Sequence, residues 1–317
     1  MSSTSTSILS STLSFLIPTL CASAEWDPNA ITVVSDLYDP YDIAIDSEDN
    51  LIVADTENHL LRKLFPNGTN ITLVTNTKIT SVFIDKFDNI YFTDTFGDEV
   101  HLLNSDDGEI ITVAGGNDPG SELDQLKLNG DPGIYVDQNL SLYISDTGND
   151  RVVKYFRNAT SGIIVAGGHG RGSALNQLNA PYGIYVDEFN EIGAIYICDT
   201  FNHRIQKWLE GAIQGITVAF HDEQLRAPIS ILLEPTLDHI MMMYISSFDL
   251  EQVLKWIPYA EEAQSIIAGS NFGSDSNQLE APRGIKFDKN WNLFVADTGN
   301  DRIQKFLFNI SSCLISY

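Results

Sequence analysis

Two sets of acidic residues recur along the sequence in positions that could bind cations. The first set precedes threonine and consists of Asp55, Asp94, Asp146, Asp199 and Asp297. The second set ends short apolar runs and consists of Asp46, Asp85, Asp137, Asp187, Glu234 and Asp288. Hard cations bind several oxygen ligands at once, so a ring of such carboxylates could form a cation site. An acid at a strand end also accepts turn N–H groups, and we expect this structural role for both sets.

The residue types needed for catalysis do not converge in the same way. The apolar runs that precede the second set open with polar residues that include Asp42, Asp131 and Arg283, without a histidine. No G-x-S-x-G nucleophile elbow, phosphate-binding loop or Cys-x-x-Cys pair occurs in the sequence. We therefore expect no catalytic residue, no bound metal and no cofactor, which favours a protein that is not an enzyme.

Both sets belong to a segment that repeats about every 50 residues. The Asp-Thr pairs follow at intervals of 39, 52, 53, 47 and 51 residues when Ser246-Ser247 is counted as the fifth copy. Each copy holds about four apolar runs, rich in Ile, Val, Tyr and Phe and separated by turn-forming residues. Such runs are typical of β-strands. Four strands per copy predict one blade of a β-propeller each, because a single sheet cannot bury both of its faces alone.

The last copy lacks its fourth strand after residues 303–306. A matching run occupies residues 31–36, ahead of the first copy. Pairing of these two segments would close the ring and leave no open edge for aggregation. The sequence thus predicts an all-β, six-bladed propeller of four-stranded blades over residues 25–308, a tail at 309–317, and a monomeric ring.

The repeated pattern Asp-Thr-x-Asn-His/Asp-Arg-Ile/Val-x-Lys resembles the NHL-repeat family. Asn58-His59-Leu60 and Asn202-His203-Arg204 carry the resemblance most clearly, and the pattern covers nearly all of residues 30–308. It implies a six-bladed propeller but no single activity, since the family includes RNA-binding modules, extracellular sensor domains, receptor ectodomains and a lyase. Blade five departs most from the pattern, because it has Ser246, Ser247 and Asp249 in place of Asp-Thr-x-Asn.

Residues 1–24 are typical of a secretory signal, with an apolar run at 8–20 and small residues at 22–24. Five Asn-x-Ser/Thr sequons in expected turns or loops also favour a secreted glycoprotein, at Asn67, Asn70, Asn139, Asn158 and Asn309. Cleavage after Ala24 would remove Cys21. The other two cysteines either form a Cys198–Cys313 disulfide or leave Cys198 buried and free.

The net charge of −25, from 43 acidic and 18 basic side chains, bears on the class of partner. Nucleic-acid affinity depends on Lys and Arg displacing counterions, so this composition argues against nucleic-acid binding. It also disfavours anionic membranes, and no apolar run is long enough for membrane insertion. A protein or glycan ligand fits better.

Aromatic residues that interrupt the repeat mark a candidate binding face. Phe96, Phe201 and Phe248 lie in the turns after the second strand of a blade, where other copies have Glu or Gly. Long loops at 116–131, 168–180 and 269–281 are expected on the same face, near Tyr41, Tyr182 and Arg283 at the channel mouth. Exposed aromatic residues on loops are common in recognition surfaces. We expect a non-catalytic, secreted interaction module, with a metal-dependent hydrolase or lyase of the six-bladed type as the alternative.

Overall fold

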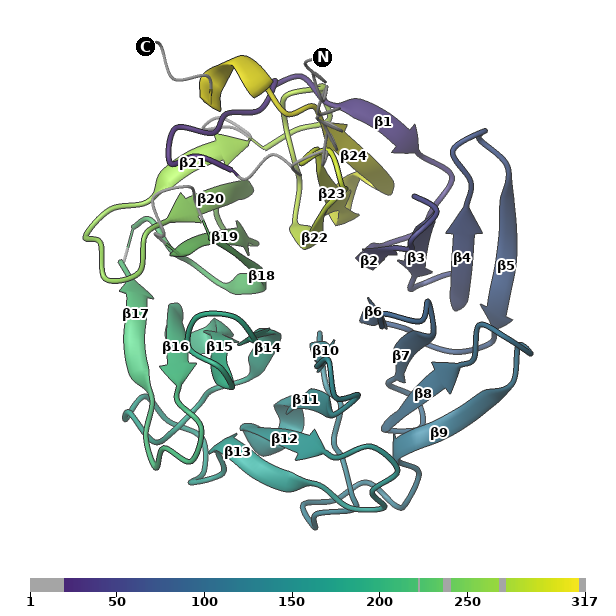
Figure 1. Cartoon of the computed structure of the whole chain (residues 1–317), viewed down its shortest axis with the longest axis vertical. Helices are drawn as coiled ribbons and strands as arrows, with labels where there is room; N and C mark the ends of the chain where they lie inside the picture. The colour runs from purple at the N-terminus through teal and green to yellow at the C-terminus, as the bar shows by residue number, and fades with distance from the viewer. Residues whose placement is uncertain (1–19, 222, 236–240, 268–271, 314–317) are drawn as a thin grey trace, which may run out of the picture.

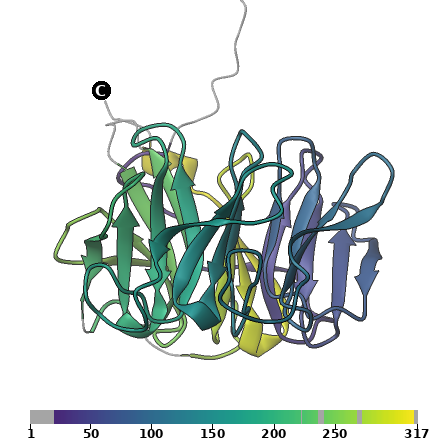
Figure 2. The ribbon, with the colours of Figure 1, turned by 90° about the horizontal axis from the view of Figure 1, so that it is seen from below.

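The computed structural model describes residues 20–221, 223–235, 241–267 and 272–313. Its 24 strands form six antiparallel, four-stranded sheets that stand as blades around a central axis (Figure 1). The strands run between the two faces of a disc (Figure 2). The six-bladed propeller is thereby confirmed. Most of the expected signal segment (residues 1–19) and residues 314–317 of the expected tail lie outside the described residues.

Each blade contains four strands that follow one another in the chain, except the last. The first three blades are formed by β2 (Pro40–Ile45), β3 (Leu51–Asp55), β4 (Leu60–Leu64) and β5 (Asn70–Thr75); β6 (Val82–Ile84), β7 (Ile90–Asp94), β8 (Glu99–Leu103) and β9 (Ile110–Gly115); and β10 (Ile134–Val136), β11 (Leu142–Asp146), β12 (Arg151–Tyr155) and β13 (Ile163–Gly167). The last three are formed by β14 (Pro181–Asp187), β15 (Ala194–Asp199), β16 (Arg204–Trp208) and β17 (Ile216–Phe220); β18 (Pro228–Pro235), β19 (Met241–Ser247), β20 (Gln252–Trp256) and β21 (Gln264–Ile267); and β22 (Pro282–Phe287), β23 (Leu293–Asp297) and β24 (Arg302–Phe306) with β1 (Ile31–Val34).

The two ends of the chain close the ring, as the sequence predicts. Strand β1 pairs antiparallel with β24, with Thr32 opposite Gln304. The contact between the termini continues beyond this pair, through a bridge between Trp26 and Phe308 and a disulfide between Cys21 and Cys313. The closing strand therefore belongs to a longer seam that joins the head and tail of the described chain.

The hydrophobic core lies between neighbouring blades. The longest inter-blade loops contribute to it, because the Leu178 and Leu279 side chains are fully buried. Each leucine therefore anchors its loop between blades. Within the described part of the chain, helix is confined to four 3-10 turns, η1 (Thr147–Asn149), η2 (Thr200–Asn202), η3 (Thr298–Asn300) and η4 (Ile310–Cys313). None of the helices in the described residues could cross a bilayer.

Alternating strand directions give the disc two different faces. We call the first the loop face; it carries the turns between the second and third strands of each blade and the connections from one blade to the next. We call the opposite one the hairpin face; it carries the turns between the first and second strands and between the third and fourth strands. The Asp-Thr motifs lie on the loop face, and the second set of acids lies on the hairpin face.

The Asp-Thr motif ties each long loop to its own blade. The buried Asp199 carboxylate accepts hydrogen bonds from the Asn179 amide, the Asn202 side chain and Arg204 Nε at 2.7–2.9 Å. Arg204 also donates to three loop carbonyls within residues 173–177. Equivalent bonds surround three other aspartates, namely Asp55, Asp146 and Asp297.

Two further motif positions connect most blades to the next one. Thr200 Oγ1 donates to the Pro228 carbonyl at 2.8 Å, and His203 Nδ1 accepts from the Ala227 amide at 3.0 Å. His203 has a positive φ of 53°. The same interaction recurs where acids replace the histidine, at Asp98, Asp150, Glu251 and Asp301. The histidine position of the motif is thus an inter-blade clamp.

Candidate functional site

Arg283 occupies the centre of the loop face, at the mouth of the channel. Its guanidinium carbon lies 3.9 Å from the centroid of the Tyr41 ring and 5.0 Å from that of Phe248. The same guanidinium forms an ion pair with Asp131, which belongs to the blade across the channel. Arg283 Nε is buried and has no hydrogen-bond partner among the described residues. This arrangement combines cation–π contacts at the channel mouth with one unpaired donor buried beneath it.

Tyr182 and Phe201 extend this cluster towards blade four. Their ring centroids are 6.1 Å apart, and Phe201 is 55% exposed. Gly130, with a φ of +73°, lets the loop before Asp131 pass against the Tyr182 hydroxyl, where any side chain would collide. Burial, and then the neighbouring Tyr41 hydroxyl, raises the pKa of Tyr182. Tyr41, Tyr182, Phe201, Phe248 and Arg283 therefore form one patch, which we call the aromatic–arginine cluster.

Phe96, the sixth residue expected on this face, stands apart from the cluster. It is 62% exposed, and its ring packs edge-on against His59 with the centroids 5.1 Å apart. The sequence predicted all six residues on one face, because the turns of the repeat determine the face on which each residue lies. It could not separate Phe96 from the others, because that distinction depends on which blades adjoin across the channel.

The channel beneath the aromatic–arginine cluster is almost filled. Only about 40 Å³ remains beside Arg283 and Asp42, which is room for about one water molecule. Close approach of the inner strands explains this narrowness, because a Cβ on Gly133 would stand 2.6 Å from the Tyr182 carbonyl oxygen. Asp42 accepts hydrogen bonds from Ser81 Oγ and two backbone amides, and burial raises its pKa.

Aromatic rings fill the half of the channel nearer the hairpin face. The centroids of Phe83 and Tyr135 lie 4.9 Å apart, and those of Tyr135 and Tyr185 lie 5.3 Å apart. Lys286 Nζ lies 5.6 Å from the centroid of Phe83. These side chains narrow the channel, so a ligand on the loop face would contact a shallow surface.

The second set of acids performs the structural role that the sequence suggested. Asp46, for example, accepts from the amides of Glu48 and Asn50 in the hairpin turn that follows it. Equivalent bonds surround four other members of the set, namely Asp85, Asp137, Asp187 and Asp288. Among the residues that the structure describes, no three His, Cys, Asp or Glu side chains are grouped so that they could share a metal ion.

Glu234 is the exception in this set, and it gives a testable pH dependence. Burial raises its pKa to about 7. Burial, and then the charge of Glu234, raises the pKa values of the Tyr185 and Tyr244 hydroxyls. The pKa of Glu234 in the folded state exceeds its value of about 4.3 in the unfolded chain. The contribution of this group to the free energy of unfolding is therefore fully present below that value and is lost as the pH rises through about 7.

We expect Glu234→Gln to remove this loss. Between pH 4.5 and pH 8, the wild type should lose as much as about 3 kcal/mol more unfolding free energy than the variant. Urea unfolding of both proteins at the two pH values measures the difference. Parallel pH dependences in the two proteins would contradict the assignment.

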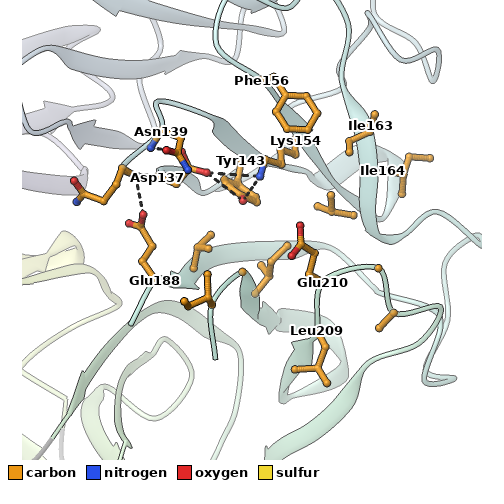
Figure 3. Close-up of a pocket in the computed structure, with 18 of the residues that line it drawn as sticks. Asp137, Asn139, Tyr143, Lys154, Phe156, Ile163, Ile164, Glu188, Leu209 and Glu210 are labelled. Carbon is orange, nitrogen blue, oxygen red and sulfur yellow. Dashed lines mark hydrogen bonds and ion pairs between the residues drawn. The ribbon is translucent and has the colours of Figure 1, made fainter. Parts of the chain in front are cut away.

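A sizeable cavity lies elsewhere, in a groove between blades three and four on the hairpin face (Figure 3). Its volume is about 670 Å³, and Phe156, Ile164, Ile192 and Leu209 give it largely apolar walls. We call it the blade 3–4 groove. Sequence reasoning missed it because its walls come from turns of different blades, and no local pattern records the gap between them.

The one basic side chain in the blade 3–4 groove has a structural explanation. Lys154 Nζ contacts the Tyr143 hydroxyl at 2.6 Å and Asp137 at 3.6 Å. The equivalent lysines of blades one and six pair with their own hairpin acids, Lys63 with Asp46 and Lys305 with Asp288. Because the same lysine–acid pair recurs in three blades, it supports the blade itself.

The cysteines resolve the two alternatives left open by the sequence. Cys198 is buried and free, so the Cys198–Cys313 disulfide is wrong and the free-thiol alternative is correct. Cys313 instead pairs with Cys21. The sequence argument discarded Cys21 together with the expected signal, which is why it missed this pair.

Comparisons with known proteins agree with the propeller fold. The sequence model of the NHL repeat matches residues 37–64. No curated protein matches the sequence significantly. Similar solved structures include a gluconolactonase from Xanthomonas campestris, 13% identical with a TM-score of 0.67 over 92% of this chain and 97% of that one. At this level of identity the similarity shows the fold alone.

Two other similar structures illustrate how varied such propellers are. A catalytically inactive virginiamycin B lyase from Staphylococcus aureus, with quinupristin, is 12% identical with a TM-score of 0.58 over 88% of this chain and 98% of that one. A chain of a nidogen/laminin complex is 16% identical with a TM-score of 0.55 over 72% of this chain and 79% of that one. The comparisons thus include both enzymes and a protein found in a complex.

Proposed function

We propose that this chain, an NHL-repeat β-propeller, is a secreted, non-catalytic interaction module that binds a protein or glycan ligand through its loop face. One observation carries the proposal: Arg283 closes the channel, and aromatic side chains surround it at the surface. The loop face therefore offers a shallow patch with a cation, one exposed ring at Phe201 and half-buried rings around them. Such patches suit surface recognition, where aromatic and arginine residues contribute much of the binding energy.

The chemistry of the patch narrows the kind of ligand contact. The side chain of Arg283 is 14% exposed, and its guanidinium could donate to a carbonyl, carboxylate or hydroxyl oxygen of a peptide or sugar, whereas Nε itself is buried. Phe201 offers a flat apolar surface beside it. The strongly negative charge of the chain favours ligands with basic groups around these contacts.

The alternative, a metal-dependent hydrolase or lyase, would need free ligands in the same place. The two channel carboxylates are already engaged, Asp131 by Arg283 and Asp42 by Ser81 and backbone amides. A divalent ion there would have to displace a guanidinium and break these bonds. For this reason we favour the interaction module.

Combined alanine substitution of Phe96, Phe201 and Phe248 tests the proposal. We expect at least a tenfold loss of affinity for ligands found by screening glycan arrays and displayed extracellular proteins, because large apolar contacts are removed. The melting temperature should change little, since Phe96 and Phe201 are mostly exposed.

The matched control replaces exposed phenylalanines of the hairpin face, Phe87 and Phe189, which are 57% and 75% exposed. These substitutions should leave the affinity unchanged. If the control weakened binding and the loop-face variant did not, the proposed surface would be wrong.

A further inference from the structure

All five sequons lie on one side of the disc. Asn67 and Asn70 belong to the β4–β5 hairpin, Asn139 to the β10–β11 turn and Asn158 to the β12–β13 turn. Asn309 follows β24, which ends at the same side. All five asparagines are exposed. The loop face carries none, although its turns and connections hold many of the surface residues.

Two of the sequons occupy equivalent turns with the same residue pattern. Phe65-Pro66-Asn67-Gly68-Thr69 and Phe156-Arg157-Asn158-Ala159-Thr160 both place a phenylalanine two residues before the asparagine. The first turn is closed by a bond from the Gly68 amide to the Phe65 carbonyl at 2.9 Å, and the second by one from the Ala159 amide to the Phe156 carbonyl at 2.8 Å. A tight turn therefore brings each asparagine back towards its phenylalanine.

The side-chain amide of Asn67 is oriented so that its nitrogen is available for glycosylation. Asn67 Oδ1 accepts hydrogen bonds from the Thr69 amide at 3.0 Å and from Thr69 Oγ1 at 2.7 Å. Nδ2, the atom that is modified, has no hydrogen-bond partner among the described residues. In glycosylation, Nδ2 forms a bond to C1 of a pyrophosphate-linked sugar donor while the C1–O bond to the pyrophosphate breaks and one amide proton is released.

Both phenylalanines border apolar grooves that a sugar could cover. Phe156 is 54% exposed and lines the blade 3–4 groove (Figure 3), onto which Asn139 also opens. Phe65 lines a smaller groove of about 340 Å³ between blades one and six. The C–H faces of a pyranose ring are apolar and fit flat against a phenyl ring.

We propose that the hairpin face carries N-linked glycans, principally at Asn158 and Asn67, and that the first sugar on Asn158 packs on Phe156 at the rim of the blade 3–4 groove. The glycans then cover one face and leave the aromatic–arginine cluster bare. This inference depends on export of the chain and is independent of which ligand the loop face binds.

Expression of the full chain in a eukaryotic secretory host, followed by glycopeptide mapping, tests the sites. We expect sugar on Asn158 and Asn67. Protein that carries no sugar, or sugar only at other asparagines, would overturn the assignment.

A double-substitution experiment tests the packing on Phe156. In the glycosylated protein, Asn158→Gln should lower the melting temperature by about 2 °C, and it should have no further effect once Phe156→Ala is present. Phe87→Ala is the matched control, because Phe87 is exposed on the same face but precedes no sequon; in its background the effect of Asn158→Gln should persist. Equal effects in both backgrounds would overturn the packing.

Two measurements separate this inference from the proposed function. Protein secreted to a bacterial periplasm without sugar should show no stability change on Asn158→Gln. Ligands that bind the loop face should bind the glycosylated and sugar-free proteins alike, so a failure of loop-face binding would leave the glycan result intact.

Discussion

Replacing Cys313 with serine is expected to lower the free energy of unfolding of the oxidised protein by up to about 5 kcal/mol. The Cys21–Cys313 disulfide joins residues 292 positions apart, so it removes a very large loop entropy from the unfolded chain. It also holds the described N-terminal segment in place, where the Leu20 side chain is fully buried. Urea unfolding of both proteins, with and without reductant, measures the effect.

The controls for this expectation are specific. Reduced wild type should match the Cys313→Ser variant, and Cys198→Ala should leave the response to reductant unchanged because Cys198 is free. If reductant did not change the free energy of unfolding of the wild type, the disulfide would be wrong.

Alkylation also decides between the disulfide and signal cleavage after Ala24. Cleavage at that position would remove Cys21 and leave Cys313 unpaired, so the two cannot hold in the same molecule. Under denaturing, non-reducing conditions we expect one alkylated thiol, Cys198. Two alkylated thiols would show that Cys21 had been removed.

The second large effect concerns the Asp-Thr motif. Arg204→Met should cost about 3–5 kcal/mol, because it leaves the buried Asp199 carboxylate without its cation and three loop carbonyls without their donor. Thermal or urea unfolding measures the loss. As a control, Arg171→Met removes an ion pair whose arginine side chain is 64% exposed, and it should cost less than about 1 kcal/mol.

Blade five supplies a natural reference for this motif. There Ser247, and not Ser246 as the sequence alignment predicted, faces Gln252 in the register where Asp199 faces Arg204. Ser247 Oγ bonds to the backbone of Arg226. The double variant Asp199→Ser, Arg204→Gln should therefore cost less than the sum of the two single changes. Strict additivity would indicate that the two side chains act independently.

The repeat made the fold predictable, including the closing strand. The segment ITVVSD at 31–36 could be matched to the strand missing after residues 303–306 because each blade repeats the same four runs. The structural roles of Asp199 and His203 followed from the same regularity. Features that occur only once could not be predicted in this way, because no other copy in the sequence repeats them.

The features that sequence reasoning missed arise between blades or between termini. Arg283 was a candidate, but its ion pair with Asp131 spans residues 152 positions apart and could not be read from either segment. The blade 3–4 groove depends on how far apart two neighbouring sheets stand. The Cys21–Cys313 disulfide forms because the first described residues pass beside the end of the last blade, and the sequence does not show that proximity.

The account rests on the loop face as the binding surface, and hydrogen exchange of a complex tests this most directly. With a ligand from the screens bound, we predict slower amide exchange in the turns at 94–98, 199–203 and 246–250, and unchanged exchange in the hairpin turns at 85–89 and 187–191. Protection confined to the hairpin turns would contradict the account.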